Sequence, residues 1–363
     1  VGGEYSVLSL NNAESALGVH VEGDAGDAED ENGHGSHVTS IVLSSRKARG
    51  SNDAPVWNGV APGVSLVAVK AFDETGAGNY LDVIRAIDWV VAKKDNYNIR
   101  VLNLSFSAPP NSFYFDDPLN QAVMRAWQAG IVVVVAAGNS GPDPMSIGVP
   151  GNNPYVITVG ALTDAYTPGD WSDDYIPPFS AAGPTYEGFV KPEVVAPGGH
   201  VVGLMDARST IATEHPEFHD GDKYFIMSGT SQATAIVSGI AALLLQDEPG
   251  LTPDEVKYRL MSSARPAVYT SGSDAMTYSV FQQGAGLVDA YDAIHSNTVG
   301  AANRGLDIDA DLANTAHFGG PASAYEEKSK GKSYYVYYVR DNMGEPLSGD
   351  GYLWSDTYFI ANG

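Results

Sequence analysis

Three residues, each in its own short block, have side chains that could act together on a carbonyl group. Ser231 lies in SGTSQATA (228–235), directly before apolar residues with helical spacing. Backbone N–H groups at a helix start favour an anion, as a serine nucleophile needs when its substrate develops an oxyanion. Taken alone, the pattern favours a serine or threonine that only caps the helix.

A histidine and an asparagine supply the other two blocks. His34 lies in NGHGSHVTSIV (32–42), where flanking glycines let backbone approach the ring, and His37 is the better candidate for a structural histidine. This histidine pair lacks a convincing third ligand, so it is weak evidence for a metal site. Asn139 follows an apolar run in AAGNSGP (136–142), where it could form a turn or donate its amide to an oxyanion.

Alternating strands and helices would position these blocks. The expected strands are 65–73, 101–107 and 131–139, and the expected helices lie within 33–45, 76–94, 118–129, 231–245 and 251–264. Near-continuous apolar strands predict an α/β fold with three layers, a mostly parallel sheet with helices on both faces. Ligand sites gather at the carboxyl ends of such strands, which here include residues 103–107 and 136–139.

The two ends of the chain differ from the middle in their composition and in their pattern of polar and apolar residues. Residues 1–33 are acidic and favour irregular structure, while the alternation in DIDADLANTAHF and KSYYVYYVRDN predicts antiparallel strands beyond about residue 296. The chain begins at Val1 without a signal peptide or initiator methionine, so we expect a processed or truncated product.

Composition excludes several classes of function. The net charge of −24 argues against binding nucleic acid, whose phosphates would be repelled, and is compatible with a surface adapted to salt. The absence of cysteine excludes disulfides, thiolate metal sites and thiol catalysis. No apolar run is long enough for a membrane span.

The three blocks, in this order, resemble the subtilisin-like serine peptidases. VVVVAAGNSG, KPEVVAPG and LTPDEVKYRLMSSA also follow the order of that family, so the resemblance covers about residues 32–293. It implies a peptidase domain over 1–295 and leaves 296–363 as a β-rich, incomplete C-terminal extension. It also implies Ser231 as the nucleophile, His34 as the general base and Asn139 as the side-chain donor to the oxyanion.

The resemblance implies a substrate groove as well. Its residues are Leu104, Ser105 and Phe106 on the edge that pairs with substrate, Gly76 and Gly78 on the opposite wall, and Ala136, Ala137, Gly138 and Gly148 around the primary specificity pocket. These small residues favour a large or apolar P1 side chain. Ser107, Ser36 and Ala235 depart from the family pattern, and Ser107 is expected to narrow the pocket.

The family's aspartate, which orients the histidine, is not visible. It is expected on a central strand roughly 30 residues before the histidine, within Asp-Thr-Gly or Asp-Ser-Gly. Glu4 is near the right count in a poor context, and Asp24, Asp27 and Asp30 are too close to the histidine. We favour an acid on a separate or cleaved N-terminal segment, over replacement by Glu4 or a loop aspartate, and over an inactive binding protein.

The leading hypothesis is therefore a secreted serine endopeptidase, located outside the cell or at its surface, that acts on proteins or peptides. The main alternative is a catalytically inactive peptide-binding or surface protein. An esterase or lipase fits less well, because GTSQA is not the GxSxG of those enzymes. The family also implies structural Ca²⁺, for which Asp24–Glu31 and Asp170–Asp174 offer carboxylates without defining a site.

Overall fold

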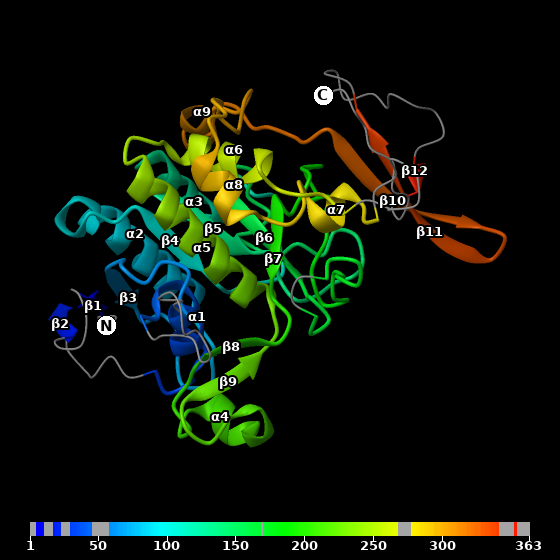
Figure 1. The fold of residues 1–363 in the computed structure, drawn as a ribbon. Coiled ribbons are helices and arrows are strands. Elements are labelled where there is room, and N and C mark those ends of the chain that lie inside the picture. The colour runs from blue at the N-terminus through cyan, green and yellow to red at the C-terminus, as the bar shows by residue number, and fades with distance from the viewer. Residues whose placement is uncertain are drawn as a thin grey trace.

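A computed structural model describes residues 5–10, 17–22, 30–45, 58–167, 170–267, 277–340 and 352–353. Its centre is a parallel sheet of four strands in the order β4 (Val101–Leu104), β5 (Val132–Ala136), β6 (Ile157–Leu162) and β7 (Val194–Pro197) (Figure 1). Every residue of β5 and β6 is buried, as their continuous apolar sequences require. The expected parallel sheet is confirmed.

Helices pack around this sheet. Those that match the expected ranges are α1 (His34–Leu43), α2 (Tyr80–Tyr97), α3 (Pro118–Gln128), α5 (Thr230–Asp247) and α6 (Pro253–Ser262). Two short helices, α7 (Val280–Gln283) and α8 (Ala290–His295), were not expected from the sequence. Helix α5 packs against all four parallel strands, and α3 packs on α2 and β5. Helix α6 begins with the capping box expected from Thr252 and Glu255. Apolar residues of α3, β5 and α5 share one core.

The N-terminal region corrects the expectation of irregular structure. Strands β1 (Tyr5–Leu10) and β2 (Leu17–Glu22) form an antiparallel pair, and β1 also pairs antiparallel with β3 (Leu66–Val69). Strand β3 therefore belongs to a second sheet instead of extending the parallel one. The segments YSVLSL and LGVHVE carry apolar residues that suit strands, a signal outweighed in the sequence by the acidic residues around them.

A hairpin beside α1 had no counterpart in the sequence analysis. Strands β8 (Val201–Leu204) and β9 (Tyr224–Met227) pair antiparallel and are joined by a segment containing α4 (Thr210–Glu214) and the 3₁₀ turn η1 (Pro216–Phe218). The hairpin packs on α1, as Figure 1 shows.

The C-terminal region is partly as expected. Strands β10 (Ala322–Ser329), β11 (Lys332–Val339) and β12 (Tyr352–Leu353) form an antiparallel sheet that extends away from the rest (Figure 1). Residues 308–312, expected as a strand, instead form helix α9 (Ile308–Leu312). The reason is local: the Asp307 carboxylate accepts the N–H groups of Asp309 and Ala310 and starts a helix.

Helix α9 packs on α3 and on the main apolar core. Asp311 is buried and accepts the hydroxyls of Tyr114 and Tyr155, each at 2.8 Å, and one of its oxygens lies 2.9 Å from His317 Nδ1. The division of the chain at residue 295 stays a prediction.

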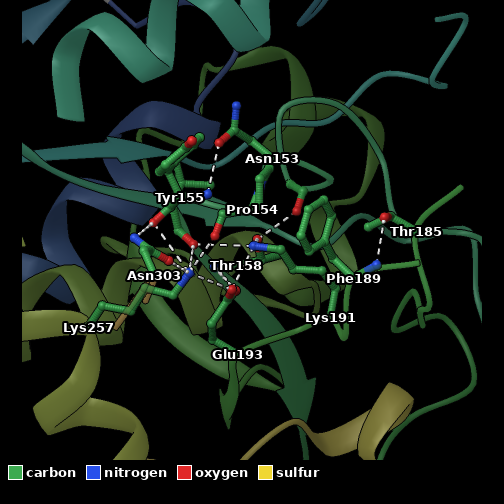
Figure 2. Close-up of polar contacts among 12 residues, drawn as sticks. Asn153, Pro154, Tyr155, Thr158, Thr185, Phe189, Lys191, Glu193, Lys257 and Asn303 are labelled. Carbon is green, nitrogen blue, oxygen red and sulfur yellow. Dashed lines mark hydrogen bonds and ion pairs between the residues drawn. The ribbon is translucent and has the colours of Figure 1, made fainter. Parts of the chain in front are cut away.

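A buried charge cluster lies between β7, α6 and the segment that leads to α9 (Figure 2). Glu193 Oε1 lies 2.7 Å from Lys191 Nζ and 2.8 Å from Lys257 Nζ. Lys257 also donates to Asn303 Oδ1, and Thr158 N donates to the other oxygen of Glu193. Burial lowers the pKa of Lys191 to about 7, despite the opposing effect of Glu193.

Candidate active site

Ser231 is the second residue of α5, and the helix cap is Gly229, which has no side chain to cap with. The Ser231 hydroxyl therefore does not cap the helix. It donates to the Ser105 carbonyl oxygen at 3.0 Å, and the Ser105 hydroxyl donates to the Ser231 carbonyl at 2.9 Å. Asn103, at the end of β4, holds the Ser105 hydroxyl with its amide. The carboxyl end of β4 and the start of α5 therefore meet at Ser231.

Asn139 follows β5 and is fixed at the same helix start. Its Oδ1 accepts both the N–H and the hydroxyl of Thr230, each at 3.0 Å. In the described part of the chain, its amide nitrogen donates to no group, and a Cβ atom built on Gly229 would lie 3.4 Å from that nitrogen. Asn139 thus presents a free amide donor beside the N-terminus of α5, as an oxyanion donor requires.

His34 is the first residue of α1 and follows Gly33, which has φ +97°. Burial lowers the pKa of His34, and the negative charge of Asp30 partly offsets this. Helices α1 and α5 pack together through Val38, Ile41 and Ala235. Among the described hydrogen bonds, none joins His34 to Ser231, whose hydroxyl faces Ser105 instead. The helices that carry His34 and Ser231 therefore pack together, but the side chains of these two residues are not hydrogen-bonded to each other.

His37 behaves as the structural histidine that its position suggested. It is fully buried, its Nε2 lies 3.1 Å from the Phe225 carbonyl oxygen, and its Nδ1 lies 3.4 Å from the Gln232 amide. Burial lowers the pKa of His37 to about 4, so the ring is neutral near pH 7. A neutral ring with one donor and one acceptor nitrogen matches these two partners.

The residues expected around the specificity pocket lie together. A Cβ atom on Gly138, which has φ +107°, would lie 3.1 Å from Ser107 Oγ, and one on Gly148 would lie 2.9 Å from Ser107 Cβ. Ser107 therefore lies between these two glycines. Ala136 and Ala137, which precede Gly138, are buried. The Ser107 side chain fills space between the two glycines, where the sequence analysis expected it to narrow the specificity pocket.

The two expected walls of the groove also approach each other. The Phe106 ring lies 5.2 Å from that of Phe72, and a Cβ atom on Gly78 would lie 2.6 Å from the Phe72 ring. Gly76, with φ +78°, lies beside the Asn32 side chain, whose amide donates to the Glu74 carbonyl. Leu104, at the end of β4, is buried.

The acid that would support His34 is not assigned. Glu4, Asp24 and Asp27 lie outside the described residues. Both oxygens of Asp30 are occupied as a cap for α1, because they accept the N–H groups of Gly33 at 2.9 Å and Ser36 at 2.5 Å. Sequence reasoning treated Asp30 as part of an exposed loop and missed this capping role, which its position before a helix could have indicated.

No group of three or more acidic or histidine side chains that could hold a metal ion occurs among the described residues. In the 170–174 loop, Asp170 accepts two hydrogen bonds from Ser172, and Asp173 accepts the Thr167 hydroxyl. These carboxylates accept hydrogen bonds from neighbouring residues of the same loop. They are therefore not arranged as ligands of a calcium ion. The other candidate loop, 24–31, lies largely outside the described residues.

The family model that matches this chain is that of the subtilase family, over residues 11–286. The chain belongs to the subtilase family. The serine protease AprX of Bacillus subtilis (strain 168) is 41% identical to this subtilase over 255 residues, which cover 67% of the chain and 57% of AprX. Subtilisin DY of Bacillus licheniformis is 34% identical over 237 residues, covering 65% of the chain and 71% of that protein. This subtilase thus spans little more than half the length of AprX.

Solved structures agree with the fold of this subtilase. Sphericase has a TM-score of 0.56 at 28% identity, over 71% of this chain and 78% of its own. The prenylagaramide maturation protease PagA has a TM-score of 0.51 at 28% identity, over 73% of this chain and 82% of its own. The α/β class expected from the sequence is confirmed. In the described ranges, no helix combines the length and the apolar character needed to cross a membrane.

Proposed function

We propose that this subtilase is a serine endopeptidase that cleaves peptide bonds through an acyl-enzyme on Ser231. The observation that carries the proposal is the shared location of two groups at the start of α5. The Ser231 hydroxyl is free of any capping role, and the Asn139 amide, without a partner among the described residues, lies beside Gly229 at the same helix start. A nucleophile next to preorganised donors suits attack on a carbonyl.

In this mechanism the hydroxyl of Ser231 leaves the Ser105 carbonyl and turns toward His34. The oxygen attacks the scissile carbonyl carbon while His34 accepts its proton. The tetrahedral oxyanion receives hydrogen bonds from the Asn139 amide and the Ser231 backbone N–H. As the intermediate collapses, His34 passes the proton to the leaving amine. Water then hydrolyses the acyl-enzyme by the same sequence in reverse, and no metal takes part.

The lowered pKa of His34 supports its role as the base. Because burial disfavours the imidazolium, the ring is neutral and able to accept a proton near pH 7. The same burial makes the imidazolium formed during the reaction costly unless a negative group faces it. Asp30 supplies part of that charge from its capping position.

We further propose that the acid comes from an additional strand at the free edge of β4. In the part of the chain that the structure describes, β4 pairs only with β5, and its first three residues are half-buried although VLNL is mostly apolar. The carboxyl end of a strand on that edge would lie near Ser105, which contacts Ser231. The segment would belong to another part of the protein or to a separate chain.

The alternatives differ in what they require. Replacement by Asp30 would require the carboxylate that caps α1 to accept a bond from His34 as well, and Glu4 lies outside the described residues. An inactive peptide-binding protein would keep the groove and lose the reaction. We also propose that the protein is secreted to the cell exterior or surface and that it binds structural calcium. Both proposals rest on the resemblance to subtilisins.

Labelling with a fluorophosphonate probe tests the proposed reaction. We expect a single adduct on Ser231, none in Ser231→Ala, and an unchanged adduct in the matched variant Ser228→Ala. A folded protein that forms no adduct on Ser231 would favour the peptide-binding alternative. Intact-mass analysis of the purified protein tests the separate acid, because a second peptide carrying Asp-Ser-Gly or Asp-Thr-Gly should accompany an active sample.

A further inference from the structure

We propose that the β8–β9 excursion, defined as residues 205–223, is a positioning element for His34. It holds the short segment that leads into α1 and so fixes where the base begins. This inference rests on the proposed role of His34 as general base. The excursion contains α4 and η1, and neither had been assigned a function from the sequence.

Two backbone hydrogen bonds connect the excursion to the residues before His34. The N–H of Thr210 donates to the Glu31 carbonyl at 2.8 Å, and the N–H of Ile211 donates to the Asn32 carbonyl at 3.1 Å. Both donors belong to the first turn of α4, whose N–H groups have no partner within their own helix. The start of α4 thus uses its free donors to hold the chain two and three residues before His34.

Packing at Gly33 adds a steric constraint. A Cβ atom on Gly33 would lie 2.6 Å from Ser209 Oγ and 3.0 Å from Met205 Cγ. Ser209 is 3% exposed, and its hydroxyl has no hydrogen-bond partner among the described residues. The backbone of the residue before His34 is therefore pressed directly against the excursion.

The excursion is itself firmly attached to the β8–β9 hairpin. Met205 N donates to the Lys223 carbonyl at 2.9 Å, and the side chains of Met205, Ala212 and Phe225 form a small apolar cluster. The Asp220 carboxylate accepts three backbone N–H groups of its own turn. An element closed in this way can act as a fixed support.

The opposite side of the same segment is held by the loop after β3. Asn32 donates to the Glu74 carbonyl, and Glu31 forms an ion pair with Lys70. Residues 31–33 are thus fixed between the excursion and this loop. A base must lie within hydrogen-bond reach of the proton that it accepts, so loosening one side should slow the reaction more than it weakens substrate binding.

The variant Thr210→Pro removes one of these bonds and little else. Thr210 is the first helical residue of α4, a position where proline is tolerated, and Ser209 has φ −63° and ψ 156°, which suits a residue before proline. The matched control is Thr210→Ala, which keeps the N–H. Because the lost bond is an ordinary one, we expect kcat to fall roughly two- to ten-fold against the control, with KM unchanged.

Two further readouts separate positioning from a general loss of stability. We expect the acid limb of the kcat/KM profile, and the NMR titration of the His34 ring, to move to higher pH in Thr210→Pro, because a looser segment admits more water to the half-buried ring. Equal kcat and equal His34 titration in the two variants would overturn the inference. A shifted titration in a protein that never acylates Ser231 would support the positioning and refute the proposed function.

Discussion

Ser105 and Ser231 hold each other by a reciprocal pair of hydrogen bonds, in which each hydroxyl donates to the other residue's carbonyl oxygen. The pair joins the carboxyl end of β4 to the start of α5. It also occupies the Ser105 carbonyl, which lies on the edge proposed to pair with the substrate backbone. A substrate N–H that donates to this carbonyl would share the acceptor with the Ser231 hydroxyl and weaken its bond, which would link substrate binding to release of the nucleophile.

Replacing Asn139 by aspartate should separate the two roles of this side chain, which are to accept hydrogen bonds from Thr230 and to donate one to the oxyanion. Aspartate keeps the oxygen that accepts from Thr230 but loses the amide donor, and its charge opposes an oxyanion. We expect kcat to fall by at least roughly 100- to 1,000-fold, with a circular dichroism spectrum like that of the parent. Thr230→Val keeps the Asn139 amide and removes the hydroxyl that donates to Asn139 and accepts the Gly138 N–H, so it serves as control and should lose far less. Equal losses in the two variants would argue for a purely structural Asn139.

Replacing Ser107 by glycine should enlarge the specificity pocket, because its side chain lies between Gly138 and Gly148. We expect the preference for a large aromatic P1 residue over alanine to rise roughly ten-fold, measured as a ratio of kcat/KM values with two peptide substrates. The control Ser45→Gly, an exposed change after α1, should leave this ratio unchanged. A ratio in Ser107→Gly equal to that of the parent would place the P1 side chain elsewhere.

Replacing Asp30 by asparagine should lower the pKa of His34 further, since the negative charge of Asp30 now raises it against the effect of burial. The base must be neutral to act, so the acid limb of the kcat/KM profile should move to lower pH. Asparagine keeps one oxygen acceptor for the cap of α1. Asp82→Asn, an exposed change on α2, is the control. A limb that moves to higher pH would contradict this electrostatic account.

Much of the fold was predictable because its strands and helices carry strong local signals. The continuous apolar run of β5 and the capping box at Thr252 each determine their element almost alone. The hairpin β1–β2 was missed because the acidic residues around it outweighed the signal of its apolar residues, and the α4 segment was missed because it packs against distant residues. Residues 308–312 were misassigned because the cap at Asp307 decides for a helix where polar–apolar alternation suggested a strand.

Motif and order predict His34, Asn139 and Ser231 as the residues of the candidate site, and their roles stay predictions. The structure brings their elements together, but the sequence did not indicate the contacts. The bond from Ser231 to Ser105, the cap made by Asp30 and the support from α4 could not be foreseen, since each depends on backbone groups that carry no sequence signature.

The buried cluster of Lys191, Glu193 and Lys257 should make stability depend on pH. The pKa of Lys191 is about 7 in the folded protein, below the ordinary value of 10.5, so between these values the unfolded chain binds more protons. The free energy of unfolding should therefore rise as pH increases from about 7 toward 10. Urea titrations in an inactive Ser231→Ala background would measure this, and Lys191→Met should reduce the rise. A rise of the same size in Lys191→Met would exclude Lys191 as its source.

The proposed function depends on hydrolysis through an acyl-enzyme on Ser231. The most direct measurement is acid-quenched mass spectrometry within the first turnover of an activated peptide ester. We expect a transient mass increase equal to the acyl group, located on Ser231 by peptide mapping and absent in Ser231→Ala. Turnover of the ester without this increase, or an acyl group on any other residue, would contradict the proposed function.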